Sequence, residues 1–265
     1  IGLEIGSVYA ALGTQVTIIE MAGDILPGAD EDLVHFLSAR IRQLAHRVVL
    51  KAGVQAMKEV SGGIEVAMEG EDIHETHVFE KVLVTVGRRP NSSGIGLAST
   101  KVEVDERGIV VVDAQRRTTD PAIYAIGDLT GQPMLAHKAT HEGRTVAEVI
   151  AGKSAEFTPR AIPAVVYTDP EIAWCGLTER EAARQKRPVK IARFPWSASG
   201  RASTIHRNDG LTKIIADPDT DQVLGVGIAG TNAGELIAEG VLAIEMGALA
   251  TDIELTIHAH PTLSE

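Results

Sequence analysis

The most informative segment of the chain reads His258-Ala259-His260-Pro261-Thr262-Leu263-Ser264-Glu265. His260 and Glu265 are five residues apart, and a proline directly follows the histidine. Because proline fixes its own φ and disfavours the helical conformation in the residue before it, we expect an extended segment or loop to end at His260. Thr262-x-x-Glu265 has the pattern of a capping box, which predicts that a helix begins there. Such a turn can bring the Glu265 carboxylate back to the His260 imidazole.

This spacing leaves two interpretations open. A histidine held by a carboxylate is a general base that works near neutral pH. The plainer interpretation is that Glu265 only caps a helix and that His260 is an ordinary interface histidine. Spacing alone favours the plainer one, because a histidine–acid pair without its nucleophile is a weak signal.

The same eight residues resemble the C-terminal active-site signature of the dihydrolipoamide dehydrogenase family, the flavoprotein component of 2-oxo acid dehydrogenase complexes. The resemblance runs essentially end to end and is closest to the bacterial form. It implies that His260 is the acid–base catalyst, contributed from the neighbouring subunit of a homodimer, and that Glu265 orients it. It further implies FAD and NAD as cofactors, dihydrolipoamide as substrate and lipoyl domains of a 2-oxo acid dehydrogenase complex as partners.

Length and composition restrict the class of protein. The 265 residues suffice for two domains, and 44% of them are apolar, which suits a globular protein. No apolar run approaches the roughly 20 residues of a membrane span. A net charge of -11 argues against general nucleic-acid binding. We therefore expect neither a nucleic-acid nor a membrane partner.

Cysteine content and the two ends of the chain bear on its cellular location. The single cysteine, Cys175, excludes an internal disulfide framework and suits a reducing compartment. We expect the bacterial cytoplasm, with the mitochondrial matrix as the alternative. Ile1 lies inside an expected helix and Glu265 at the start of another, so we expect that the sequence is truncated at both ends.

The first 90 residues have the pattern of an NAD-binding domain that lacks its first strand. Apolar residues at helical spacing over residues 1–12 precede a hydrophobic strand over 14–20. This order is the second half of a dinucleotide-binding βαβ unit, with Gly2 as the third fingerprint glycine and Glu20 on the ribose 2′-OH. No arginine follows Glu20 to pair with a 2′-phosphate, which predicts NAD rather than NADP.

The remainder of this domain is predicted as an amphipathic helix over 30–44 and strands over 48–50, 53–60, 64–68 and 78–86. The last strand runs into Gly87, where the absence of a side chain lets backbone approach the nicotinamide side of the cofactor. Arg88 and Arg89 are equally compatible with a cofactor contact and with plain solvation.

Residues 91–155 resemble the returning segment of an FAD domain. A hydrophobic strand over 118–126 is expected to end in Gly127-Asp128, and a helix then runs to residue 150. Asp128 can accept a hydrogen bond from a ribityl hydroxyl, and the free N–H groups at the helix start favour the negative charge of reduced flavin. The candidate FAD contacts are Asp128, Met134, Leu135, Ala136 and His137.

Residues 156–265 have the pattern of a mixed dimerisation domain. Strands are expected over 162–168, 172–176, 189–195, 211–217 and 223–229, with helices opening at Thr178 and spanning 233–246. Cys175 falls in one of these strands and is expected to be a buried, inert thiol. No metal site is expected, because no acid or cysteine completes a ligand set around the pairs His137/His141 and His258/His260.

The sequence therefore predicts an α/β protein with a truncated Rossmann-like NAD domain, a partial FAD-domain segment and a C-terminal α+β dimerisation domain. Its predicted activity, as an intact protein, is oxidation of dihydrolipoamide by NAD through FAD and a redox disulfide. Two alternatives remain. One is another disulfide reductase such as a soluble transhydrogenase, and the other is a catalytically inactive remnant, because a redox cysteine pair is absent from these residues.

Overall fold

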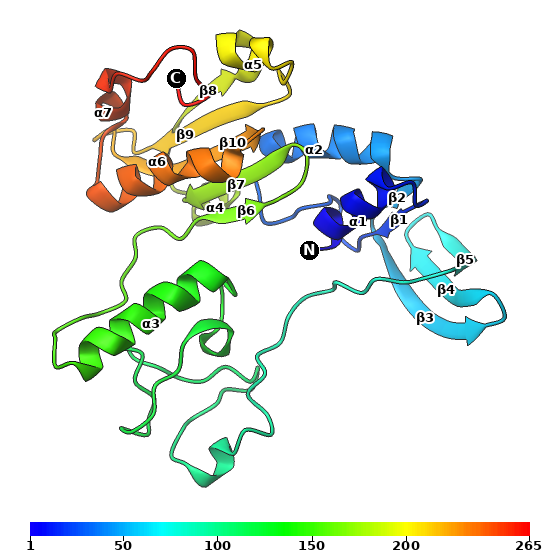
Figure 1. The fold of residues 1–265 in the computed structure, drawn as a ribbon, viewed down its shortest axis with the longest axis horizontal. Coiled ribbons are helices and arrows are strands. Elements are labelled where there is room, and N and C mark those ends of the chain that lie inside the picture. The colour runs from blue at the N-terminus through cyan, green and yellow to red at the C-terminus, as the bar shows by residue number, and fades with distance from the viewer. The chain divides into compact units, whose positions relative to one another are not determined.

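The computed structural model describes residues 1–265 and divides them into two compact units. Unit 1 combines Ile1–Thr85 with Arg160–Glu265, and unit 2 comprises Val86–Pro159 (Figure 1). The three domains expected at 1–90, 91–155 and 156–265 stay a prediction. None of the helices combines the length and the apolar character that crossing a bilayer requires.

Unit 1 begins with the expected helix and parallel strands. Helix α1 (Gly2–Ala11) leads into β1 (Thr17–Ile19), which pairs in parallel with β2 (Arg47–Val49). Helix α2 (Glu31–Leu44) connects the two strands, as in half of a dinucleotide-binding unit. An antiparallel sheet of β3 (Ala52–Val60), β4 (Gly63–Gly70) and β5 (His74–Phe79) follows.

The strand predicted over 78–86 is wrong. Strand β5 ends at Phe79, and no strand forms between residues 80 and 86. Leu83 and Val84 are 54% and 59% exposed there, although both are apolar. A strand needs a neighbour to accept its backbone hydrogen bonds, and the parallel sheet of unit 1 consists of β1 and β2 alone. The apolar composition is therefore that of a strand, but no pairing partner is present.

The C-terminal part of unit 1 is a five-stranded antiparallel sheet in the order β6-β7-β10-β9-β8. The strands are β6 (Ala164–Val166), β7 (Glu171–Gly176), β8 (Lys190–Pro195), β9 (Leu211–Ala216) and β10 (Val223–Gly230). Four helices accompany them, namely α4 (Glu179–Gln185), α5 (Gly200–Thr204), α6 (Ala233–Met246) and α7 (Ala250–Leu255). The α+β prediction for this region is confirmed.

The two faces of this sheet are covered by helices from opposite ends of the sequence. On β7, Ala173 packs in a core cluster with residues of α6, whereas Ile172 packs in the cluster that contains α2. Successive strand residues point to opposite faces, so α6 and α2 lie on opposite sides of the sheet (Figure 1). The early helix α2 thereby becomes part of the same compact unit as the late sheet.

Unit 2 contains one long helix and little regular structure besides it. The 3-10 turns η1 (Leu97–Ser99) and η2 (Gly127–Thr130) precede α3 (Ala136–Ile150). The helix is confirmed, but the strand predicted before Gly127 is wrong, because only an isolated bridge joins Arg117 to Tyr124. Residues 86–159 contain no second strand long enough to pair with it.

Candidate functional site

The C-terminal segment brings His260 and Glu265 together. The Nδ1 atom of His260 lies 2.8 Å from Oε2 and 3.0 Å from Oε1 of Glu265. The helix predicted beyond Pro261 does not form, because the four residues that follow cannot complete a hydrogen-bonded turn. The Thr262 hydroxyl instead donates to the carbonyl of Ala259 at 2.6 Å and closes a tight turn.

This geometry selects the tautomer of His260. An ionised carboxylate only accepts hydrogen bonds, so Nδ1 carries the proton that it donates to Glu265. The other ring nitrogen, Nε2, is then unprotonated, and the side chain is 75% exposed. A neutral imidazole with a free, accessible Nε2 can accept a proton from a substrate, and the carboxylate stabilises the imidazolium that results.

The neighbouring His258 has a different environment. Its Nδ1 faces the carbonyl of Thr256 at 3.0 Å, and its Nε2 faces Oε1 of Glu239 at 2.6 Å. Because both partners are acceptors, both bonds require a doubly protonated imidazolium. The hydrogen bond that His258 donates to Glu239 accordingly raises the pKa of His258. In that doubly protonated form, His258 has no nitrogen lone pair to offer a substrate or a metal ion.

A pocket of about 510 Å³ lies beside this tail. Its walls are apolar side chains of the five-stranded sheet and of α6, such as Ile228 and Leu236, and Glu265 lines it. Glu239, Glu254 and His258 line the pocket as well, so its apolar wall stands beside several charged or titratable groups.

Two of the three candidate NAD residues share unit 1. A Cβ atom on Gly2 would lie 2.5 Å from Oγ1 of Thr85, so α1 approaches the segment that precedes residue 86 as closely as a glycine allows. Glu20 directly follows β1, and its Oε1 accepts the N–H of Ala22 at 2.8 Å. Gly87, with φ at +125°, belongs to unit 2.

The candidate FAD residues gather around the start of α3 in unit 2. Asp128 lies in η2, Met134 and Leu135 precede the helix, and Ala136 and His137 form its first turn. The N-cap residue Leu135 offers no side-chain hydrogen bond, so backbone N–H groups at the start of this helix have no side-chain partner at the cap.

Arg88, for which the sequence left solvation and a cofactor contact equally open, contacts the same region. Its guanidinium lies 3.5 Å from Oδ2 of Asp128 and donates to the carbonyl of Met134 at 3.2 Å. Arg88 is therefore more than a solvated charge, because it links η2 to the segment before α3.

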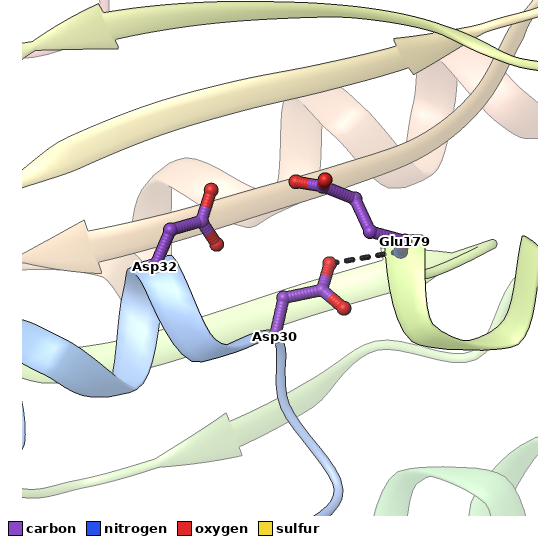
Figure 2. A group of neighbouring side chains, drawn as sticks. All are labelled: Asp30, Asp32 and Glu179. Atoms are coloured by element: carbon purple, nitrogen blue, oxygen red, sulfur yellow. Dashed lines mark hydrogen bonds between the residues drawn. The ribbon is translucent and has the colours of Figure 1, made fainter. Parts of the chain in front are cut away.

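Three carboxylates with metal-ligand spacing meet in unit 1, and a buried lysine contacts all of them. Asp30, Asp32 and Glu179 offer oxygens within 4.8 Å of one another (Figure 2). The ammonium of Lys213 donates to all three at 2.7, 2.7 and 2.8 Å, and this side chain is 1% exposed. A cation of the protein already occupies the centre of the cluster, which is therefore an ion-pair network between α2, α4 and β9.

Cys175 is the only cysteine and lies in β7 with 1% of its surface exposed. Burial raises the pKa of its thiol to about 12. The thiolate needed for nucleophilic or redox chemistry is thus disfavoured at this position.

Sequence reasoning did not anticipate Lys213, nor the fully buried Glu142 of α3 with its partner Lys138. Glu142 and Lys138 are four residues apart on a helix, a spacing that indicates a pair but not its burial. Nothing in the sequence connects Lys213 to Asp30, from which it is separated by 183 positions.

Comparisons with known proteins match both the N-terminal and the C-terminal part of the chain to one family. The model of the pyridine nucleotide-disulphide oxidoreductase family matches residues 1–143, and that of the dimerisation domain of the same family matches residues 162–265. Dihydrolipoyl dehydrogenase of Haemophilus influenzae is 49% identical over 265 residues, which are 100% of this chain and 55% of that protein. The Thermus scotoductus dihydrolipoyl dehydrogenase is 46% identical, with 100% of this chain and 58% of that protein covered.

A solved structure gives the same result for the fold. The HOCl-induced flavoprotein disulfide reductase RclA from Escherichia coli matches with a TM-score of 0.90 and 26% identity, over 100% of this chain and 60% of that one. The chain thus spans little more than half the length of the relatives that it matches.

Proposed function

This chain belongs to the pyridine nucleotide-disulphide oxidoreductase family, and on that premise we propose that the whole protein is an NAD-dependent dihydrolipoamide dehydrogenase. The reaction converts dihydrolipoamide and NAD⁺ into lipoamide, NADH and a proton. The observation that carries the proposal is the His260–Glu265 pair, which leaves Nε2 of an exposed imidazole free to accept a proton. Relatives named dihydrolipoyl dehydrogenase, at 42–49% identity, support the choice of substrate.

The residues of unit 2 fit an FAD. Asp128 keeps a half-exposed carboxylate that can accept a hydrogen bond from a sugar-alcohol hydroxyl, and the N-cap residue of α3, Leu135, makes no side-chain hydrogen bond to the positive end of that helix. Asp128, Leu135 and Ala136 would hold the cofactor there. When bound, the flavin supplies a two-electron carrier between the dithiol and NAD. Gly2 and Glu20 would bind NAD, Glu20 through the ribose hydroxyls.

His260 does the proton chemistry. Its Nε2 takes the proton of a substrate thiol, because the thiolate is the species that attacks a disulfide. Glu265 holds the ring and stabilises the imidazolium in the meantime. Cys175 is too buried to take part, so the disulfide belongs to residues outside this sequence.

Two observations support a homodimer of the whole protein. The dimerisation model covers residues 162–265, and apolar side chains of the α6–α7 region are exposed to an unusual degree. Met246 and Leu255 are each 75% exposed, and Ile257 is 98% exposed. Patches of this kind mark protein interfaces. We propose that a second copy covers them, and that lipoyl domains of a 2-oxo acid dehydrogenase complex deliver the substrate in the cytoplasm.

The test is steady-state kinetics of the whole protein with dihydrolipoamide and NAD. His260→Ala should reduce kcat by about 10²–10⁴-fold, as removal of a general base typically does, and should keep the flavin spectrum. Glu265→Ala should cost less, since it removes only orientation and charge stabilisation. Wild-type turnover in His260→Ala with a normal spectrum would refute the assignment. A wild-type protein that oxidises NADPH with NAD but not dihydrolipoamide would be a transhydrogenase, and one with neither activity a remnant.

A further inference from the structure

Glu142 is a buried charge that the proposed chemistry does not use. It lies in the second turn of α3 and is 0% exposed. Its Oε2 accepts the backbone N–H of Gly127 at 2.6 Å, and its Oε1 accepts the hydroxyl of Thr130 at 3.2 Å. Both partners belong to η2, the turn that carries Asp128.

Lys138 completes the network from the opposite side of the same turn. Its ammonium donates to the carbonyl of Gly127 at 3.3 Å, to the carbonyl of Gly131 at 3.1 Å and to Oγ1 of Thr130 at 3.0 Å. The same ammonium lies 3.2 Å from Oε1 of Glu142 and is 5% exposed at its side chain. Arg116 adds a second cation 3.4 Å from Glu142.

These bonds fix the turn at both of its ends. The N–H of Gly127 is bound by Glu142 and its C=O by Lys138, so the orientation of the next peptide, which leads into Asp128, is determined. Gly127 has φ at +73°, and a Cβ there would lie 3.1 Å from the Cβ of Ala139. The network therefore holds Gly127 in a left-handed conformation at a point where only a glycine can pack closely against α3.

The desolvation cost of burying Glu142 and Lys138 indicates that they serve to position the turn rather than to stabilise the fold. Buried ion pairs add little net stability, because the desolvation of both charges offsets their attraction, and apolar residues of similar volume are often as stable. The carboxylate of Asp128 itself has only Arg88, at 3.5 Å, and is 48% exposed. Its backbone is therefore rigidly held while its side chain stays available to a ligand.

We propose that Glu142 and Lys138 are positioning residues for the flavin, holding the Gly127–Gly131 turn so that Asp128 meets the cofactor at the start of α3. This inference rests on the proposed function, which places FAD there. Neither residue touches the cofactor, and both act through the backbone of the turn.

The experiment measures flavin binding and thermal stability of the whole protein. Flavin is removed, and the dissociation constant for FAD is determined by quenching of its fluorescence for wild type, Glu142→Gln, Lys138→Met and the double variant Lys138→Met/Glu142→Gln. Glu148→Gln is the control, because Glu148 forms an exposed i,i+4 pair with Arg144 on the same helix. Asp128→Asn reports on the proposed flavin site itself.

The single variants should weaken FAD binding about tenfold and lower the melting temperature, since each removes one member of the buried Glu142–Lys138 pair and leaves the other. The double variant should recover part of the melting temperature, because both members of the buried Glu142–Lys138 pair are gone and only Arg116, 15% exposed, loses its carboxylate partner. Its binding of FAD should stay weakened. Glu148→Gln should match wild type in both. A double variant that recovers both quantities would show that the network only stabilises the fold and would overturn the inference.

The remaining outcomes separate this inference from the proposed function. If Asp128→Asn weakens FAD binding and the network variants bind FAD as wild type does, the inference fails and the proposed function stands. If the wild-type whole protein binds no FAD, or Asp128→Asn leaves binding unchanged, the proposed flavin site fails and the inference with it.

Discussion

The two units each contain a buried charge cluster. The central residue is a cation in unit 1 and an anion in unit 2, and its partners are distant in the sequence in unit 1 but near in unit 2. In unit 1 one buried cation, Lys213, faces three carboxylates, two of which are 181 and 183 positions away in the sequence. The more exposed Arg193 also pairs with Asp32 and Glu179. In unit 2 a single anion, Glu142, faces two cations and binds a turn only 12 to 15 positions away. The first cluster joins distant elements into one unit, whereas the second shapes a local turn. Burial of charge therefore has two uses here, tertiary assembly in unit 1 and positioning in unit 2.

The largest expected effect tests the assembly role. Lys213→Met removes the buried cation from three carboxylates, of which Asp32 and Glu179 keep only the partly exposed Arg193. Breaking a buried network of this kind costs about 3–5 kcal/mol. We expect a corresponding loss in the free energy of unfolding of the whole protein, measured by urea denaturation. Lys190→Met is the matched control, because Lys190 pairs with Asp221 at 2.8 Å while 65% exposed, and it should cost about 1 kcal/mol or less. Equal losses in the two variants would remove the distinction between buried and exposed pairs.

The pH dependence of stability gives a second test of the Lys213 cluster. Burial alone would lower the pKa of Lys213, but its hydrogen bonds to Asp30, Asp32 and Glu179 outweigh burial and raise it. Burial alone would raise the pKa of Asp32, but hydrogen bonds from Lys213 and Arg193 bring it below its ordinary value. The stabilisation from Lys213 is present below pH ~10.4 and lost as the pH rises through its folded pKa, and that from Asp32 is present above pH ~3.9 and lost as the pH falls through its folded pKa.

We therefore expect the stability difference between wild type and Lys213→Met to be constant between about pH 5 and 9 and to narrow in more acidic solution. In the variant, protonation of carboxylates that have lost Lys213 relieves the repulsion among them, so the variant loses less stability on acidification. Melting temperatures at a series of pH values measure the difference. A difference that changes steadily between pH 5 and 9 would contradict this assignment of the charges.

A smaller effect concerns the helix that carries Glu179 into the cluster. Thr178 caps α4 by accepting the N–H of Glu181 at 3.1 Å, and Thr178→Ala should cost about 1 kcal/mol. Ser199→Ala removes a similar cap from α5, which carries no residue of the cluster. In the Lys213→Met background the cost of Thr178→Ala should shrink, because the neighbouring interaction is already lost, while the cost of Ser199→Ala should not. Additive costs for both would show that α4 and the cluster are independent.

What the sequence could predict depends on how local each feature is. Helix α6 was predicted at its observed bounds, Ala233–Met246, and the cap at Thr178 was predicted from its capping-box pattern. Both features depend on nearby residues alone. The strands expected over 78–86 and 118–126 needed partners that these 265 residues do not supply, so the same composition gave irregular chain.

The candidate sites divide in the same way. The approach of Glu265 to His260 followed from a spacing of five residues, although the helix expected to produce it is absent. On α3, the pairs Lys138–Glu142 and Arg144–Glu148 have the same i,i+4 spacing, yet Glu142 is 0% exposed and Glu148 is 35% exposed. Charge pattern gives the pairing, but only the packing of η2 against one face of the helix distinguishes the positioning pair from the solvated one.

The smallest expected effect extends the comparison to a charge pair near the surface. His258 lies between the carbonyl of Thr256 and the carboxylate of Glu239, and the pair with Glu239 raises its pKa. Glu239→Gln should lower that pKa, because an amide can satisfy the hydrogen bond without stabilising the positive charge. The stabilisation is present below pH ~6.5 and lost as the pH rises through the folded pKa. With Glu239 itself 43% exposed, it should amount to less than about 1 kcal/mol. Titration of the imidazole resonances by NMR measures the shift, and His260, whose partner Glu265 is untouched, is the internal control. An unchanged or higher pKa for His258 in Glu239→Gln would mean that the carbonyl of Thr256, rather than the carboxylate, holds the proton on this ring.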